Sequence, residues 1–215
     1  MYRKVTVFLS ALLCCVILAS SACADDISLP DPKRDGGDGI FGLLERRATG
    51  TRGDFPKGAI SDEELSTILW AASGLNRGGK GWTVPLAGGK PPYVKIFAVK
   101  QDGAFLYDWK GHSLELVTNG GVLEKISSDG FVREAPLVLV FVSSPGSLGN
   151  MSGLNQGNAL AYIASGAMTQ NSYLAAGSLG ISARYMVSMN AGAVKSELKL
   201  DESETPLCIM PMGKR

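Results

Sequence analysis

Hydrophobic and polar residues recur along this chain at two spacings, and the clearest helical spacing lies between residues 61 and 74. Its apolar positions fall three or four residues apart, at Leu65, Ile68, Leu69 and Ala72. Ser61 and Glu64 form a capping-box pair at the start, and Gly74 is typical of a helix C-terminus. The pattern therefore predicts a helix that begins after Ser61 and ends at Gly74.

A second and longer helix is predicted from Asn158 to Leu179. This segment is dense in alanine and glycine, which have small side chains that permit close helix packing but, for glycine, at a cost in helix propensity. Shorter apolar clusters predict two further helices, over Ile40–Arg47 and Val194–Leu198.

Strands are predicted where the apolar residues alternate or run together. The run Leu137–Ser143 is continuously apolar, which is typical of a strand buried on both faces. The other predicted strands are Tyr93–Val99, Ala104–Tyr107, Leu114–Val117, Ile181–Met189 and Leu207–Met212. A long glycine-rich loop is expected over Asn76–Gly89. Together the helices and strands predict an α+β chain.

The N-terminus has the pattern of an export signal. A short basic region, Met1–Lys4, precedes an apolar run, and Ala22-Cys23-Ala24 fits a cleavage site before Asp25. The run is too short for a stable membrane span. Cys23 leaves a second interpretation open, a lipid-modified cysteine, although the residues before it lack the expected leucine. We expect a signal peptide over residues 1–24 and a periplasmic or secreted protein.

The mature chain is expected to contain one domain behind a short flexible segment. Residues 25–39 are rich in Asp, Pro and Gly without periodicity, which predicts flexibility. Residues 40–215 then form the domain, a length that allows a sizeable core. Cys208 is the only cysteine beyond the signal peptide, so no internal disulfide can form.

Charge and composition exclude several classes of function. The formal net charge is +1 from interspersed signs, and without a basic stripe the chain does not resemble a nucleic-acid-binding protein. His112 is the only histidine, which argues against a histidine-rich metal site and against a serine–histidine triad. The turn-like sequence around His112 predicts an exposed histidine.

The remaining candidates are cations and amides suited to an anionic, flat ligand. Arg46 and Arg47 precede a Gly/Thr loop, and arginine pairs bind phosphate through their fork geometry. Gly213-Lys214-Arg215 supplies two more cations at the end of the sequence. Each cluster could also be ordinary solvated charge. Gln170 and Asn171, inside an apolar helix, either satisfy buried backbone groups or contact the polar edge of a ligand.

These segments resemble, in order, the signature segments of the nitroreductase family of flavin enzymes. The resemblance extends from Leu44 to the end, and the related azoline-forming dehydrogenases share the pattern. The exported members in particular show an Arg-Arg-Ser start, a Leu-Trp-Ala-Ala-x-Gly-x-Asn-Arg helix end and a Thr-x-Pro-Ser-Ala loop. The matching segments here are Arg46-Arg47, Ile60–Arg77, Thr83–Gly88, Gly103–Asp108, Phe131–Val142, Gly166–Gly180 and Met210–Gly213.

The resemblance implies a fold, a partner and a cofactor. The fold would be a central, mostly antiparallel sheet flanked by helices, in an intertwined homodimer with FMN at its interface. Hydride would pass through the flavin N5 to a small-molecule electron acceptor, without an obligatory catalytic side chain or metal.

The resemblance also assigns expected positions around the flavin. Arg46 and Arg47 would face the phosphate and ribityl chain, and Gly213, Lys214 and Arg215 would close over the phosphate. The other expected contacts are Pro85, Leu86 and Ala87 beside the flavin, Gln170 and Asn171 near the ribityl chain or ring, and the backbone of Met186 and Val187 on the N5 side.

Departures from the family pattern keep other functions open. Ala48 and Leu86 replace family serines, and Met186-Val187 replaces a usual Arg-Gly pair. The segment Thr49–Arg52 is longer than usual, so Thr49, Thr51 and Arg52 receive no role. The first alternative is a catalytically degenerate module of the same fold that binds flavin weakly or not at all. The second is a secreted binding domain unrelated to flavin.

Overall fold

The computed structural model of the chain describes residues 26–55 and 58–214. In this part, seven strands form one antiparallel sheet with the order β1-β6-β5-β4-β7-β9-β8. The strands are β1 Ile27–Ser28, β4 Val94–Lys100, β5 Gly103–Asp108, β6 Ser113–Asn119, β7 Leu137–Ser143, β8 Ile181–Ala183 and β9 Thr205–Lys214. The predicted antiparallel sheet flanked by helices is confirmed.

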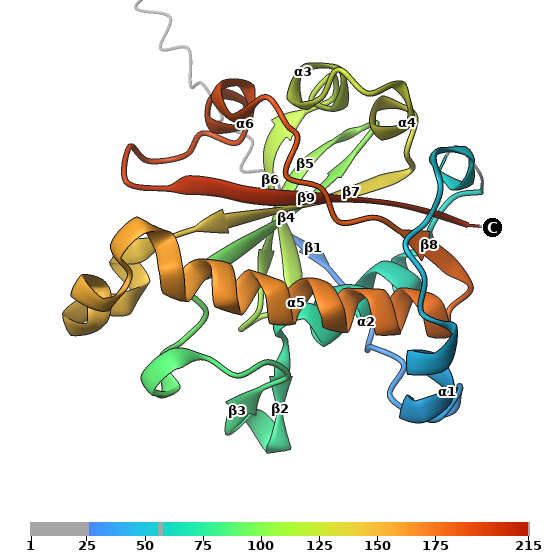
Figure 1. Cartoon of the computed structure of the whole chain (residues 1–215), viewed down its shortest axis with the longest axis horizontal. Helices are drawn as coiled ribbons and strands as arrows, with labels where there is room; N and C mark the ends of the chain where they lie inside the picture. The colour runs from blue at the N-terminus through green and yellow to red at the C-terminus, as the bar shows by residue number, and fades with distance from the viewer. Residues whose placement is uncertain (1–25, 56–57, 215) are drawn as a thin grey trace, which may run out of the picture.

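Helices cover both faces of this sheet (Figure 1). Helices α2 (Asp62–Ser73) and α5 (Ala159–Ser178) lie on one face, with α1 (Ile40–Arg46) beside α5. On the other face lie α3 (Leu123–Ile126), α4 (Gly130–Arg133) and α6 (Ala191–Glu197). The 3-10 segments are Arg52–Asp54, Arg77–Gly79, Ala87–Gly89, Pro145–Leu154 and Gln156–Asn158.

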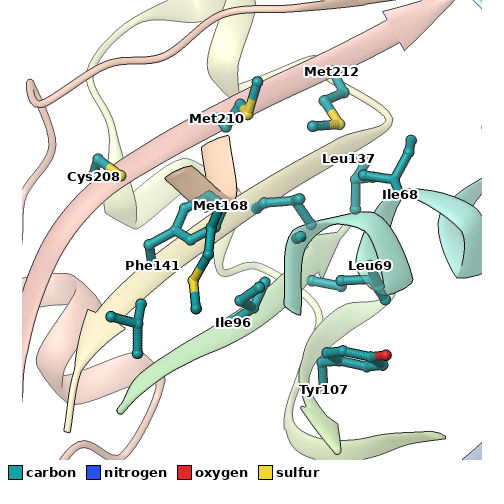
Figure 2. Close-up of a cluster of buried hydrophobic side chains, with 14 of the residues drawn as sticks. Ile68, Leu69, Ile96, Tyr107, Leu137, Phe141, Met168, Cys208, Met210 and Met212 are labelled. Carbon is teal, nitrogen blue, oxygen red and sulfur yellow. The ribbon is translucent and has the colours of Figure 1, made fainter. Parts of the chain in front are cut away.

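Strand β7 is the centre of the core, as its continuous apolar sequence predicted. All seven of its residues are buried, and it pairs with β4 on one side and β9 on the other. Because side chains alternate across a strand, its two sets of residues enter different layers. Leu137, Leu139 and Phe141 belong to the core cluster that includes residues of α2 and α5. Figure 2 shows Leu137 and Phe141 in this cluster. Val138, Val140 and Val142, which alternate with them, pack under the short helices of the opposite face.

Helix α2 begins with the predicted capping box. The Ser61 hydroxyl accepts from the Glu64 N–H at 3.3 Å, and the Glu64 carboxylate accepts from the Ser61 N–H at 2.7 Å. The helix ends at Gly74, but for a different reason from the one expected. Gly74 is not left-handed, with φ −75°. A Cβ atom there would instead overlap Trp70, so the site requires glycine for space.

Helix α5 also agrees with its prediction, apart from one residue at each end. Its buried face consists mostly of small side chains, at Ala161, Ala164, Ser165, Met168, Thr169, Ser172 and Ala176. These residues let α5 pack closely against α2 and the sheet. The opposite face, which includes Ile163 and Gln170, is exposed.

The N-terminal segment, for which the sequence predicts flexibility over residues 25–39, contacts the domain at several of its described residues. Residues 27–28 pair with β6, and the Lys33 N–H donates to the Thr67 hydroxyl at 3.0 Å. The Ser66 hydroxyl donates to the Pro30 carbonyl at 2.5 Å. An edge strand and two hydroxyls of α2 thus supply partners for a segment whose own sequence has no periodicity.

Two other predicted segments differ in detail. Within the expected loop Asn76–Gly89, the chain forms a small hairpin from β2 (Leu75–Asn76) and β3 (Gly81–Trp82). The predicted strand Ile181–Met189 is strand only as far as Ala183, followed by an isolated bridge between Met186 and Ile209. In both places the paired stretches are too short for sequence periodicity to reveal.

His112 is half-buried rather than exposed, and both ring nitrogens have partners. Its Nδ1 lies 2.9 Å from the Tyr107 hydroxyl and its Nε2 lies 2.8 Å from the Ser66 hydroxyl. Because Ser66 already donates to Pro30, it accepts from Nε2–H, so Tyr107 donates to Nδ1. Neutral His112 therefore connects β5, α2 and the N-terminal segment.

The predicted signal peptide lies outside the described residues. Among the residues that are described, no helix is long and apolar enough to cross a bilayer.

Acid is expected to weaken the His112 connection. Burial lowers the His112 pKa below 6.5, Arg34 lowers it further, and Pro30 and Asp31 partly oppose the shift. Below pH 6.5 the unfolded chain therefore binds the proton more readily than the native chain, and the free energy of unfolding falls as the pH decreases.

Urea denaturation on either side of pH 6.5 measures this loss. The variant His112→Asn keeps a residue that tolerates the left-handed backbone at this position, φ 48°. It should lose less stability than the wild type over the same pH interval. Parallel losses in the two proteins would show that His112 does not contribute.

Candidate functional site

The two predicted phosphate-binding arginines lie at the C-terminal end of α1. Arg46 forms an exposed ion pair with Asp38. The Arg47 guanidinium lies over the Tyr173 ring, 5.4 Å from its centroid. Both arginines line a cavity of about 90 Å³, which we call the α1 cavity. Its other lining residues are Leu43, Ala48, Tyr173, Leu174, Gly177, Gly180, Ile181 and Ala183.

Tyr173 connects three segments around the α1 cavity, although the sequence analysis gave it no role. Its hydroxyl accepts from the Tyr185 N–H at 2.6 Å and lies 3.5 Å from the Thr49 hydroxyl. Its ring supports Arg47. The only sequence signal was its place in the Gln-Asn-x-Tyr segment. The contacts show that Tyr173 fixes the relative positions of Arg47, Thr49 and Tyr185.

The predicted cation at Lys214 has a partner. Its ammonium lies 3.0 Å from the Glu64 carboxylate. Burial would raise the Glu64 pKa, but hydrogen bonds from Ser61 and Lys214 lower it below its usual value, so the carboxylate stays charged. Gly213 pairs with Ser182, and a Cβ atom there would overlap the Phe55 carbonyl. Arg215 lies outside the described residues.

The two adjacent amides of α5 have different surroundings. The Asn171 amide donates to the Ala71 carbonyl at 3.0 Å and to the Thr83 carbonyl at 3.1 Å. Asn171 thus satisfies backbone groups and fastens the start of the Thr83–Gly88 loop to the end of α2. Gln170, by contrast, is exposed on the outer face of α5.

The loop predicted to pass beside the flavin does not share a cavity with the arginines. Pro85 and Leu86 line a separate cavity of about 500 Å³ next to the β2–β3 hairpin. The Ala87 N–H donates to the Tyr93 hydroxyl at 3.3 Å. Within one copy of the described chain, the loop and the arginine pair therefore belong to different cavities.

Met186 and Val187 occupy contrasting positions. The Met186 N–H and carbonyl both bond to Ile209, each at 2.9 Å, so its backbone groups are already used within the sheet. Val187 is 64% exposed. If this segment contacts a ligand, Val187 is the residue that remains accessible.

Thiol and metal chemistry have little support in the described residues. The Cys208 thiol is buried, and burial raises its pKa to about 12, which keeps it protonated. No group of three or more His, Cys, Asp or Glu side chains in the described part is arranged to hold a metal ion.

Comparison with known proteins identifies the family. The family model described as "Nitroreductase family" matches residues 43–214. The chain belongs to the nitroreductase family. This assignment confirms the family predicted from the sequence motifs, and proteins of this family typically bind flavin.

Individual relatives agree with this assignment. A crystal structure from Ralstonia eutropha JMP134, named as a nitroreductase, has a TM-score of 0.79 and 30% identity, and covers 88% of this chain and 89% of that one. A protein of Methanocaldococcus jannaschii, also named as a nitroreductase, is 28% identical over 184 residues, which are 80% of this chain and 89% of that protein.

A more distant structure shares the fold alone. A chain of the Escherichia coli microcin synthetase McbBCD complex has a TM-score of 0.67 at 17% identity, with 97% of this nitroreductase-family chain and 84% of that chain covered.

Replacing Asn171 by alanine should destabilise the domain. The change removes two donors and leaves the Ala71 and Thr83 carbonyls without them. A loss of about 1–3 kcal/mol in the free energy of unfolding is expected. Gln170→Ala is the matched control, because it removes an exposed neighbouring amide and should change stability by less than about 0.5 kcal/mol. Chemical denaturation measures both, and equal effects would contradict the assigned role of Asn171.

Proposed function

We propose that this chain is an FMN-dependent oxidoreductase of the nitroreductase type. The observation that carries the proposal is Arg47, held over Tyr173 at the edge of a small cavity. FMN would supply hydride transfer at its N5, while the protein binds and orients it.

The α1 cavity fits an anionic group such as a phosphate ester. Several of its walls have small side chains or none, at Ala48, Gly177, Gly180 and Ala183, so a ligand can approach the backbone closely. In residues 26–55 and 58–214, Arg47 forms no ion pair. Its guanidinium is therefore free to bind phosphate oxygens through two parallel hydrogen bonds.

The other site residues contribute unequally in this proposal. Tyr173 holds Arg47 in place and also binds the backbone at Tyr185, beside the accessible Val187. Arg46 and Lys214 already have carboxylate partners, Asp38 and Glu64, so each contributes less to phosphate binding.

A homodimer would complete the site. Large apolar side chains are exposed near the arginines and on the outer face of α5, including Phe41 at 85% and Ile163 at 71%. Exposed apolar residues grouped in this way are typical of interfaces. In the proposed intertwined dimer, these side chains are covered and the Pro85–Ala87 loop of one copy meets the α1 cavity of the other.

A catalytically degenerate module is the second candidate function. It is favoured by Ala48 and Leu86, which bring no hydroxyl to their positions. It is also favoured by the Glu64 carboxylate, which already pairs with the Lys214 ammonium. In the primary proposal, the chain would hold FMN with its own residues, and a small-molecule electron acceptor would be its substrate. The order of the sequence motifs supports the exported, azoline-dehydrogenase-like subgroup.

The proposal predicts a difference between FMN and riboflavin, which lacks the phosphate. Arg47→Ala should weaken FMN binding about tenfold to a hundredfold, because a charged hydrogen bond contributes roughly 1.5–3 kcal/mol. Riboflavin binding should change much less. Fluorescence titration of the flavin-free protein measures both affinities.

Arg133→Ala provides the charge-matched control, since Arg133 lies on α4 on the opposite face of the sheet. Equal weakening of both ligands by Arg47→Ala would mean that Arg47 supports the fold rather than the phosphate. If wild-type protein binds neither ligand, the degenerate module becomes the correct interpretation.

We also propose that the chain is exported, on the evidence of its first 24 residues alone. Mass spectrometry of the mature protein should then give an N-terminus at Asp25. A diacylglyceryl mass on Cys23 would show a lipoprotein instead, and an intact Met1 would contradict export through a cleaved signal.

A further inference from the structure

The cavity next to the β2–β3 hairpin has features that the phosphate site does not use. It is lined by Asn76, Arg77, Lys80, Gly81, Trp82, Thr83, Val84, Pro85, Leu86 and Gly89. Two of these described residues are cations and none is an acid. Neither Arg77 nor Lys80 forms an ion pair within the described part of the chain. The cavity therefore has a net positive charge that favours an anion.

Arg77 adopts a backbone conformation that disfavours its own side chain. Its φ is 49°, in the left-handed region that glycine or asparagine adopts more readily. Gly78 and Gly79 follow it with positive φ and complete the turn. A strained non-glycine residue held in place by its surroundings is characteristic of functional sites.

Gly81 gives the Arg77 side chain its position. A Cβ atom at Gly81 would overlap the guanidinium of Arg77, so the absence of a side chain on β3 creates the space that the guanidinium occupies. Both Arg77 and Gly81 line the cavity, so the guanidinium that occupies this space belongs to the cavity wall.

The same hairpin contains polar atoms without partners. Asn76 Oδ1 and Trp82 Nε1 are buried and have no hydrogen bond, although the Asn76 amide nitrogen donates to the Trp82 carbonyl at 2.9 Å. Buried polar atoms of this kind are uncommon. The Trp82 ring is fixed by an edge contact with Trp109, with centroids 5.9 Å apart. With Leu86, it supplies an apolar wall.

We propose that this cavity binds a planar aromatic carboxylate, with the carboxylate on Arg77 and the ring against Trp82 and Leu86. Arginine matches carboxylate geometry through two parallel hydrogen bonds. If the proposed function holds, the Pro85–Ala87 loop runs beside the flavin, and the ligand is then the electron acceptor. The substrate class would be small anionic aromatics.

A second cavity combines the same residue types with acidic side chains. A cavity of about 420 Å³ between α2, α5 and the N-terminal segment also has an arginine and an indole, with Arg34 lying 5.2 Å from the Trp70 centroid. Asp35 and Asp38 line that cavity as well, so its charge favours no anion.

Two probes of the same shape test the proposal, para-nitrobenzoate and its neutral amide, para-nitrobenzamide. Equilibrium dialysis against the full-length mature protein, with and without FMN, gives both affinities. Wild type should bind the carboxylate about tenfold more tightly than the amide, which corresponds to about 1.4 kcal/mol. Added salt should reduce this preference.

Arg77→Asn removes the cation while keeping a residue that tolerates left-handed backbone. It should abolish the preference for the carboxylate, leave amide binding within about twofold, and not lower the melting temperature. Arg133→Asn is the charge-matched control and should keep the preference. Equal affinity of the wild type for both probes, or equal loss of both in Arg77→Asn, would overturn the proposal.

The FMN-free measurement separates this inference from the proposed function. Carboxylate binding that depends on Arg77 in a protein that fails to bind FMN would refute the flavin function while supporting the subsite. FMN binding without any preference for the carboxylate would refute the subsite alone.

Discussion

The burial of β7 on both faces is the constraint on which the rest of this fold depends. A strand with seven buried residues must be covered on each side, since no part of it can face water. The leucines and phenylalanine on one face are covered by the two longer helices, α2 and α5. The valines on the other face are covered by the three short helices α3, α4 and α6. The position of α5, and hence of the candidate site, follows from this arrangement.

The way helix α5 packs on the core determines where the residues of the proposed cofactor site lie. Its small buried residues set its distance from α2, and its remaining residues then lie at fixed places on the surface. Asn171 fastens the Thr83 loop, while Tyr173, half a turn further along, organises Arg47 and Tyr185. One helix therefore positions two groups of residues that line separate cavities, and the proposed dimer is what would bring those groups together.

The sequence was sufficient for the elements whose signal is local. The buried run of β7 and the capping box of α2 were predicted at their observed positions. Short paired segments such as β1 and the β2–β3 hairpin were not, because two residues carry no periodicity. The partners of His112 and Lys214 come from distant segments, and Tyr173 became significant only through Arg47 and Tyr185. Motif order predicted the family but could not show these neighbours.

Analytical ultracentrifugation of the purified protein, detected in the flavin absorption band, tests the central claim most directly. An interfacial FMN site predicts that flavin sediments with a species of twice the chain mass, with about one flavin per chain, and that the released flavin is FMN. A colourless protein, or flavin that sediments with a monomer, would contradict the account.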